Sequence, residues 1–283
     1  METGYYAGID IGSRMTKAAV ITGEGVCASR IVITRPEQRK LAHEVMEAVL
    51  ADAGVSLSEV TYVVATGYGR INVPFADRQI TEISCHARGI SFLMPTVRTV
   101  IDIGGQDSKG IKVSNGKAVD FVMNDKCAAG TGRFIEIIAE SLGVCLEDVG
   151  RMALEATDRA VISSTCTVFA EQEAVSALSR GVPVGDILAG VLDSIATRVC
   201  RMVNRLKAER DVAFTGGGAK NSGLVRMLEE KLGMPVLVPD EPLITGALGA
   251  ALLGRDIVEK AEAKGTASES HRRALREVTF FND

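Results

Sequence analysis

Three glycine-containing loops each follow a predicted buried strand, and two of them begin with an aspartate. The loops are DIGS at residues 10–13, DIGGQDS at 102–108 and TGGGAKN at 215–221. Glycine allows a sharp turn and a close approach of the backbone to a ligand, and free N–H groups in such loops form anion-binding concavities. An acid would repel a phosphate unless a cation stood between them, so Asp10 and Asp102 predict a Mg²⁺ ion, held mainly through water.

The residues around these acids predict the remaining contacts with a nucleotide. Hydroxyl groups of Ser13, Thr16 and Ser108 can donate to phosphate oxygens. The glycines at 216–218 are expected to lie against a nucleobase and ribose. The predicted nucleotide-binding residues are Gly12, Ser13, Arg14, Thr16, Lys17, Gly104, Gly105, Ser108, Gly216, Gly217 and Gly218.

Two common nucleotide-binding motifs do not occur in the sequence. It contains no G-x-x-x-x-G-K-[ST], which excludes a P-loop NTPase. No G-x-G-x-x-G opens a first helix, which disfavours a Rossmann site. Two Asp-Gly hairpins followed by a late glycine triplet resemble the superfamily of actin, hexokinase and heat-shock chaperone ATPases. In that superfamily ATP lies between two related lobes, and the same position is expected for this chain.

An internal repeat organises the elements that carry these loops. IDIG occurs at residues 9–12 and again at 101–104, and Thr16-Lys17 then aligns in the same register with Ser108-Lys109. We interpret the repeat as a duplicated unit of two strands joined by a glycine turn and followed by a third strand. Asn115-Gly116, which lies between two alternating apolar runs, predicts a tight hairpin turn.

After each three-stranded unit the pattern alternates between helices and strands, which predicts an α/β fold. It would consist of two similar lobes with a cleft between them, and the resemblance to the superfamily implies that these are actin-like (ribonuclease H-like) lobes with ATP in the cleft. The chain has 283 residues, enough for two lobes. We predict a first lobe at 1–95 with the first phosphate loop, and a second at 96–243 with the second phosphate loop, Cys127, Cys166 and the adenosine loop. A helix returning to the first lobe and a charged tail are predicted at 244–283.

Helical periodicity predicts the positions of the helices. They are expected over 41–53, from about Thr131 to Gly143, from near Cys166 to before Gly181, over 185–208 and from about Leu224. The segment LITGALGAALL predicts a close-packed helix of small residues. From about Glu259 the chain is charged, and a tail that is either helical or disordered is expected there.

None of the six cysteines forms a C-x-x-C pair, which disfavours a zinc ribbon or a ferredoxin-type cluster within one chain. We interpret Cys27, Cys85, Cys145 and Cys200 as packing residues. Cys127 precedes one predicted helix and Cys166 opens another. The partial positive charge of a helix N-terminus favours thiolates, which are the ligands of iron–sulfur clusters.

A four-iron cluster takes four thiolates, and only two cysteines of this chain are suitably placed. A two-fold dimer would supply Cys127 and Cys166 from each chain, with the cluster on the axis. The alternative is that Cys127 is an incidental turn residue and Cys166 a small buried residue.

Six stretches make the sequence similar to the activator ATPases of 2-hydroxyacyl-CoA dehydratases. These activators belong to the BadF/BadG/BcrA/BcrD-type ATPases, which include ATPase subunits of benzoyl-CoA reductase. The stretches are IDIGSRMTKAAVI, VIDIGGQDSKGIKV, MNDKCAAGTGRFIEIIAESLGV, CTVFAEQEAVSALSRG, FTGGGAKNSGLV and ITGALGAALL, within about residues 5–254. NDKCAAGTGRF and CTVFAEQE are the specific stretches, because the glycine loops are shared by the whole superfamily.

The resemblance implies a homodimer with one [4Fe-4S] cluster held by Cys127 and Cys166, together with ATP and Mg²⁺. It implies ATP-driven transfer of one low-potential electron to a partner dehydratase or reductase with its own iron–sulfur clusters. A ferredoxin or flavodoxin would be the upstream donor. Asp10 and Asp102 are assigned to Mg²⁺ and water, and Gln106 and Asp107 to orienting the attacking water, although Gln106 could equally be a plain loop residue.

Composition limits the other classes of partner. The net charge is −4, Trp is absent and no basic stripe occurs, so nucleic acid is not expected. No apolar run is long enough to span a bilayer and no signal peptide is visible, so we expect a cytoplasmic protein that does not bind membranes.

Three rival functions remain open. One is an electron donor to benzoyl-CoA reductase or another double-cubane reductase. Another is a small-molecule kinase of the same fold, which would need a base where NDKCAAGTG offers a cysteine. The third is an ATP-switched scaffold, which would need a separate peptide-binding domain that we do not expect in this chain.

Overall fold

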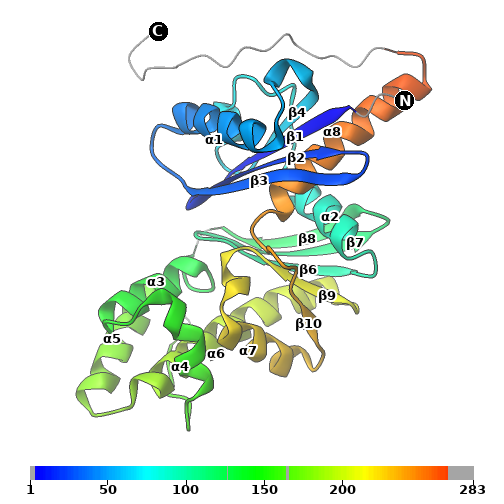
Figure 1. Cartoon of the computed structure of the whole chain (residues 1–283). Coiled ribbons are helices and arrows are strands. Elements are labelled where there is room, and N and C mark those ends of the chain that lie inside the picture. Colours follow the sequence, from blue (N-terminus) through cyan, green and yellow to red (C-terminus); the bar gives the residue numbers. More distant parts are fainter. Residues whose placement is uncertain (1–3, 126, 164–165, 267–283) are drawn as a thin grey trace. The chain divides into compact units, whose positions relative to one another are not determined.

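The computed structural model describes residues 4–125, 127–163 and 166–266, which form two compact units, each built on a five-stranded sheet (Figure 1). Of these residues, the first unit contains 4–95, 115–118 and 243–266, and the second contains 96–114 and 119–242. The predicted α/β class is confirmed. Within the described ranges, every helix is too short or too polar to cross a lipid bilayer.

The first sheet has the strand order β3-β2-β1-β4-β5. Its strands are β1 (Tyr5–Ile11), β2 (Met15–Thr22), β3 (Gly25–Ile33), β4 (Val60–Thr66) and β5 (Arg78–Gln79). The central strand β1 pairs antiparallel with β2 and parallel with β4. Because both of its faces are covered, β1 is apolar along nearly its whole length.

Helices lie on both faces of the first sheet (Figure 1). They are α1 (Gln38–Ala53), α2 (Glu82–Leu93) and α8 (Thr245–Ala263). The alternation of β1 divides its side chains between two cores: Ile9 and Ile11 pack under α1, whereas Tyr6 packs with α8.

The small residues of α8 let it lie very close to the sheet and to α2. A Cβ atom added at Gly8 would be 2.0 Å from the carbonyl oxygen of Ala247, and one added at Gly249 would be 1.7 Å from that of Cys85. The prediction of a close-packed helix for LITGALGAALL is therefore confirmed. The helix continues to Ala263, into the stretch expected as a tail, and residues 267–283 lie outside the described residues.

The second sheet has the order β10-β9-β6-β7-β8. Read from its other edge, this order is β8-β7-β6-β9-β10, so the strands follow one another in the same way as in the first sheet. Its strands are β6 (Thr99–Ile103), β7 (Ser108–Ser114), β8 (Lys117–Asn124), β9 (Val212–Thr215) and β10 (Val236–Leu237). Asp10 pairs with Lys17 across β1 and β2, and Asp102 pairs with Lys109 across β6 and β7. The duplicated unit inferred from the sequence is thus present in strand order and in register.

The helices of the second unit are α3 (Gly132–Ser141), α4 (Val149–Leu154), α5 (Thr167–Ser179), α6 (Val184–Val203) and α7 (Ser222–Leu232). The helix predicted over 185–208 ends earlier, at Val203. A 3₁₀ turn follows over Asn204–Leu206, and Lys207 then adopts a left-handed conformation with φ of 52°, which stops the helix.

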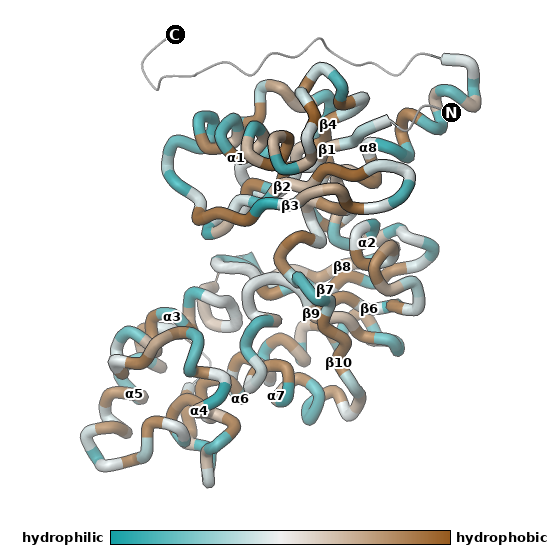
Figure 2. Tube along the Cα trace, in the orientation of Figure 1, coloured by the Kyte–Doolittle hydropathy of each residue, from teal (hydrophilic) through white to brown (hydrophobic). Residues whose placement is uncertain are grey.

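The turn predicted at Asn115-Gly116 joins β7 and β8, and both residues have positive φ angles, 50° and 73°. These values fit the type I′ turn that Asn-Gly favours. Figure 2 shows brown, apolar stretches along the strands that alternate with teal, hydrophilic turns. The three glycine loops begin where the buried strands β1, β6 and β9 end.

Candidate functional site

Asp10 is buried near the end of β1, at the base of the first predicted phosphate loop. Its Oδ2 atom lies 3.0 Å from Nζ of Lys17, the residue opposite it in the hairpin. The turn between the two strands is closed by the N–H of Gly12, which donates to the carbonyl oxygen of Met15 at 3.1 Å. The loop is therefore a tight turn built on a buried ion pair.

The side chains of the first loop differ in their surroundings. Ser13 is half-buried and Arg14 is exposed. Thr16 is buried, and its Oγ1 lies 2.9 Å from Oγ1 of Thr34, which donates its own hydrogen to the carbonyl oxygen of Gly12 at 2.8 Å. Thr16 must then donate to Thr34, so in this arrangement its hydrogen is used inside the hairpin. Thr34 was not predicted from the sequence.

The second hairpin repeats this arrangement with an additional acid. Asp102 is buried at the end of β6, and its Oδ2 lies 3.4 Å from Nζ of Lys109. The same ammonium group lies 2.8 Å from Oδ1 of Asp107. Thr215 donates to Oδ1 of Asp102 at 2.8 Å. Lys109 therefore fixes two of the predicted catalytic carboxylates, a role that we did not assign to it from the sequence.

The second loop leaves one buried hydroxyl group without a partner. Its turn is closed by the N–H of Gly104, which donates to the carbonyl oxygen of Asp107 at 3.0 Å, and Gln106 is exposed. Ser108 is only 1% exposed, and its Oγ has no hydrogen-bond partner among the described residues. A buried hydroxyl without a partner costs about 1–3 kcal/mol, so Ser108 has the property expected of a donor to a bound ligand.

A glycine closely approaches each buried aspartate. Gly67 follows β4 with φ of 82°, and a Cβ atom there would lie 2.3 Å from Oδ1 of Asp10. Gly216 follows β9 with φ of 80°, and a Cβ atom there would lie 2.9 Å from Oδ1 of Asp102. Gly67 was not predicted. The sequence did contain a signal for Gly67, because the same Thr-Gly pair stands at the end of β4 in VVATG and at the end of β9 in VAFTG.

The glycines of the third loop have different surroundings. Gly216 and Gly218 are buried, and a Cβ atom at Gly218 would lie 2.9 Å from Cβ of Ile103. Gly217 is exposed between them. The loop is therefore packed against β6 through Gly216 and Gly218, and it leaves Gly217 exposed to solvent.

The second phosphate loop is hydrogen-bonded directly to the segment that carries Cys127. The N–H groups of Gly132 and Arg133, at the start of α3, donate to the carbonyl oxygens of Gly104 and Gly105 at 2.8 and 2.9 Å. The side-chain amide of Asn124 donates to the carbonyl oxygen of Cys127 at 2.9 Å. A shift of the loop would thus act directly on Gly132 and Arg133, which follow Cys127 in the chain.

Both predicted cluster ligands, Cys127 and Cys166, are half-buried. Cys166 is the N-cap residue of α5, which confirms the predicted helix start. Cys127 lies outside the first turn of α3, which begins at Gly132, whereas the effect of a helix end is confined to that turn. Its positively charged neighbour is Arg198, whose NH1 lies 3.2 Å from the Cys127 sulfur. Sequence reasoning missed Arg198.

The other four cysteines divide into two pairs. Cys85 and Cys200 are buried as expected, and burial raises the pKa of their thiols to about 12 and about 11 respectively, so they stay neutral. Cys27 and Cys145 are exposed, so the expectation that they are buried packing residues was wrong. Cys27 lies on β3, the edge strand of the first sheet, and Cys145 on the turn after α3, where neither is covered.

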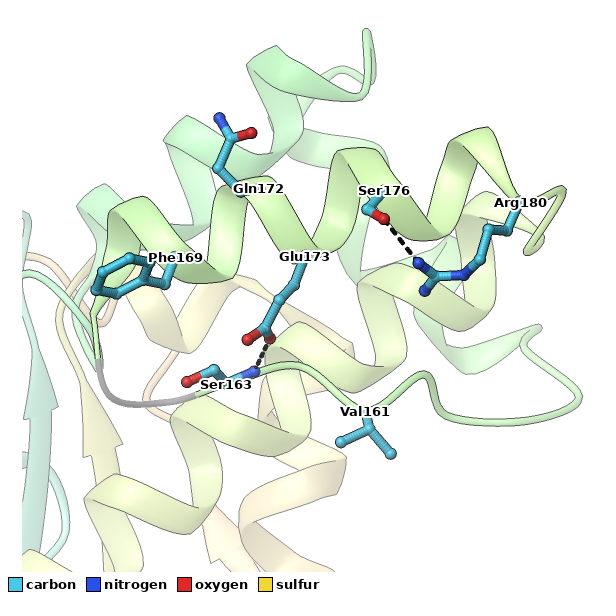
Figure 3. A pocket seen from close by; sticks show the side chains of 7 residues that line it. All are labelled: Val161, Ser163, Phe169, Gln172, Glu173, Ser176 and Arg180. Carbon is cyan, nitrogen blue, oxygen red and sulfur yellow. Dashed lines mark hydrogen bonds between the residues drawn. The ribbon is translucent and has the colours of Figure 1, made fainter.

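A cavity of about 560 Å³ lies beside α5 and the segment that precedes it (Figure 3). The N–H of Ser163 donates to the Glu173 carboxylate in its wall. Three apolar side chains close to Cys166 in sequence are strongly exposed, Val161 by 97%, Val168 by 63% and Phe169 by 66%. We refer to these three residues as the α5 patch.

Residues 7–254 match the family described as the BadF/BadG/BcrA/BcrD ATPase family. The activator of lactoyl-CoA dehydratase from Anaerotignum propionicum is 46% identical over 258 residues, which are 90% of this chain and 99% of the relative. One of the polypeptides of benzoyl-CoA reductase from Thauera aromatica is 34% identical over 272 residues, 92% of this chain and 96% of the relative.

Two solved structures are also similar. The component of the Acidaminococcus fermentans (R)-2-hydroxyglutaryl-CoA dehydratase that is designated A has a TM-score of 0.87 at 43% identity, covering 90% of this chain and 98% of that one. The activator of the 2-hydroxyisocaproyl-CoA dehydratase from Clostridium difficile, with bound ADPNP, has a TM-score of 0.85 at 42% identity, covering 94% and 100%. These similarities confirm the predicted fold and the resemblance on which it was based.

Proposed function

Because the chain belongs to the BadF/BadG/BcrA/BcrD ATPase family, we propose that it couples ATP hydrolysis to the donation of one electron to a 2-hydroxyacyl-CoA dehydratase. Relatives named as dehydratase activators support this function, since they match over nearly their whole length. The observation that carries the coupling is the pair of backbone bonds from Gly132 and Arg133 to Gly104 and Gly105. They join a nucleotide loop to a cysteine segment within one unit.

Hydrolysis of ATP requires positioning and charge more than covalent chemistry from the protein. Asp10 and Asp102 would hold Mg²⁺ through water, and Lys17 and Lys109 fix the position of one oxygen of each carboxylate. The Ser108 hydroxyl and the glycine N–H groups would donate to phosphate oxygens. Asp107, fixed by Lys109, and the exposed Gln106 would orient the attacking water. The adenosine would lie against the loop at 216–218.

The residues present fit an iron–sulfur cluster shared by two chains. No group of three or more metal-binding side chains occurs within the described ranges, so a site with four thiolates would need ligands from a second chain. Cys127 and Cys166 belong to segments held in one unit, since Ser141 of α3 donates to Glu171 of α5 at 2.7 Å. A homodimer would supply four thiolates. A bound [4Fe-4S] cluster would supply a one-electron carrier.

The remaining parts of the proposal concern the protein's surroundings. A ferredoxin or flavodoxin would deliver the electron, and an acceptor with its own iron–sulfur clusters would receive it. We expect a protein that acts between such partners to be cytoplasmic.

The test is anaerobic purification followed by iron and sulfide analysis and an electron-transfer assay with a dehydratase. We expect a brown dimer with about four iron atoms and ATP-dependent dehydratase activation. Cys127→Ala and Cys166→Ala should lose iron while retaining nucleotide binding. Cys145→Ala, which alters an exposed cysteine, should keep both. An iron-free parent protein would defeat the cluster assignment.

The similarity to a benzoyl-CoA reductase polypeptide favours a second candidate, electron donation to such a reductase. The two candidates share all steps within this chain and differ only in the acceptor. Parallel assays with a dehydratase and a benzoyl-CoA reductase would separate them, because only the correct partner should raise ATP consumption and take up electrons.

A further inference from the structure

A guanidinium group lies against one of the two cysteines to which we assign the iron. Arg198 comes from α6, and its NH1 lies 3.2 Å from both Sγ of Cys127 and the carbonyl oxygen of Ala129. The side chain passes along Gly130, where φ is 98° and an added Cβ atom would be 2.8 Å from Cδ of Arg198. A glycine at this position therefore leaves the room that Arg198 occupies on its way to the sulfur.

The charge of Arg198 is directed at the sulfur rather than at an acid. Among the residues that the structure describes, Arg198 forms no salt bridge with a carboxylate. It is half-buried, so solvent screens its charge less than that of an exposed arginine. A charged N–H donor aimed at sulfur withdraws electron density from it, and donors of this kind help to set the potential of iron–sulfur clusters.

We propose that Arg198 is a positioning residue that holds the sulfur of Cys127 and raises the reduction potential of iron bound there. The physical reason is that reduction adds a negative charge, which a nearby positive charge stabilises. This inference rests on the proposed function, because it requires that Cys127 ligates iron. It assigns to Arg198 the local positive charge that sequence reasoning had attributed to a helix end.

The same helix also contacts the hairpin of the second phosphate loop. Val203 of α6 lies so close to β7 that a Cβ atom at Gly110, the residue after Lys109, would be 3.0 Å from Cγ2 of Val203. A movement of this hairpin would therefore press on α6 near Arg198. We expect nucleotide binding to alter the contact between Arg198 and Cys127, and hence the potential.

The test is a redox titration of anaerobically purified dimer, followed by electron paramagnetic resonance, with and without MgADPNP. In Arg198→Met, which keeps length but removes charge, we expect unchanged iron content and a more negative midpoint. The reduced-to-oxidised ratio at a fixed solution potential should fall on the order of tenfold, about 59 mV for one electron. Arg198→Lys should be closer to the parent, and the nucleotide-induced shift should shrink in Arg198→Met.

The matched control is Arg201→Met, which removes an exposed positive charge from the same helix. We expect its midpoint to equal that of the parent. If Arg198→Met fails to fold, as judged by ADPNP binding, Arg198→Gln and Arg198→Lys take its place, and glutamine should give the larger shift.

The outcomes separate the two proposals. If the charge-removing variants of Arg198 have the same midpoint potential as the parent, the role of Arg198 is overturned and the proposed function stays intact. The same holds if Arg201→Met shifts the midpoint potential as much as Arg198→Met does. An iron-free parent protein overturns both. Loss of iron from Arg198→Met together with a parent midpoint in Arg198→Gln would show a purely structural role, and would also overturn the inference.

Discussion

The two buried aspartates are held by the same kinds of neighbour in both units. Asp10 has Lys17 across its hairpin and Gly67 at the end of the adjacent parallel strand. Asp102 has Lys109 and Gly216 in the same places. A buried carboxylate is costly unless it is paired, so the lysine is part of what allows each acid to be buried at a strand end. The glycine then determines how closely the neighbouring strand approaches.

Replacing Gly67 with alanine tests this close approach. Gly67→Ala forces a residue with a side chain to adopt φ of 82° and places its Cβ against Asp10. We expect a loss of about 1–2 kcal/mol of stability from the left-handed backbone, and a further loss because the added Cβ would lie 2.6 Å from the carbonyl oxygen of Ile11. Displacement of Asp10 should also weaken MgADPNP binding at least tenfold, about 1.4 kcal/mol. Urea unfolding and calorimetric titration measure the two effects.

Gly54→Ala is the matched control, because Gly54 has a φ of 70° but no atom within 4 Å of an added Cβ. It should lose only the about 1–2 kcal/mol that comes from the left-handed backbone and should retain the nucleotide affinity of the parent. If both variants bind the nucleotide equally well, Asp10 has no part in nucleotide binding.

His43 gives a prediction for the dependence of stability on pH. It is buried on α1, its Nε2 has no hydrogen-bond partner within the described part of the chain, and its ring meets Phe75 edge-on with centroids 5.2 Å apart. Burial lowers its pKa below the ordinary 6.5, although the nearby Glu47 acts in the opposite direction. The unfolded chain therefore takes up a proton more readily than the folded chain does.

Stability from this group should be fully present above about pH 6.5 and should be lost as pH falls through the lowered pKa of the folded state. We expect the free energy of unfolding of His43→Leu to fall less than that of the parent between about pH 7 and pH 5. Urea unfolding at several pH values gives this difference, and parallel curves would contradict the assignment to His43.

At this scale, sequence reasoning reached the residues that a local pattern marks and missed those that only folding brings together. Asp10 and Asp102 were found because IDIG recurs at a constant offset of 92. The offset between Thr66 and Thr215 is instead 149, because the second unit inserts α3 to α6 between its third and fourth strands. Gly67 therefore could not be found from the repeat in the sequence. Arg198 lies 71 residues from Cys127, and no sequence pattern connects them.

At the scale of the elements, the strands and helices with a clear hydrophobic periodicity were predicted from the sequence. Some of their ends were not, because they depend on single residues that the periodicity does not mark. The start of α7 is set by the side chain of Asn221, which accepts a hydrogen bond from the N–H of Leu224 at 2.9 Å and brings the helix start forward to Ser222. The end of α6 depends on the left-handed conformation of Lys207, which a single lysine does not signal.

The contact between α2 and α8 provides the prediction at this scale. A Cβ atom at Gly249 would overlap the carbonyl oxygen of Cys85, and neither backbone can yield without moving a whole helix. We expect Gly249→Ala to cost about 3 kcal/mol or more, at the upper end of overpacking effects. For a chain of this size the melting temperature should fall by roughly 6–12 °C.

Gly23→Ala is the control for this change, since an added Cβ there meets no atom within 4 Å and Gly23 lies in a turn. Its melting temperature should stay close to that of the parent. A Gly249→Ala protein that melts with the parent would mean that α8 does not pack on α2 as closely as described.

For the whole molecule, the central expectation is that two copies are needed to complete one iron site. Each chain would contribute the thiols of Cys127 and Cys166, and the α5 patch, which is close to Cys166 in sequence, exposes Val161, Val168 and Phe169. An exposed apolar patch often marks a protein–protein contact, and Val161 and Phe169 line the same cavity beside α5. We therefore expect the α5 patch to be covered in the proposed homodimer.

Phe169→Asp tests this expectation, because burying an unpaired carboxylate at a contact between protomers is strongly unfavourable. We expect the variant to sediment as a monomer and to lose iron, since each chain alone retains only Cys127 and Cys166 as ligands. It should still bind ADPNP, because Phe169 contributes to none of the nucleotide loops. Ile33→Asp, which alters an apolar side chain that is 71% exposed on β3 of the first unit, should remain dimeric and brown. If Phe169→Asp also remains a dimer with full iron content, the protomers meet elsewhere, and the second pair of thiolates must reach the iron by a different surface.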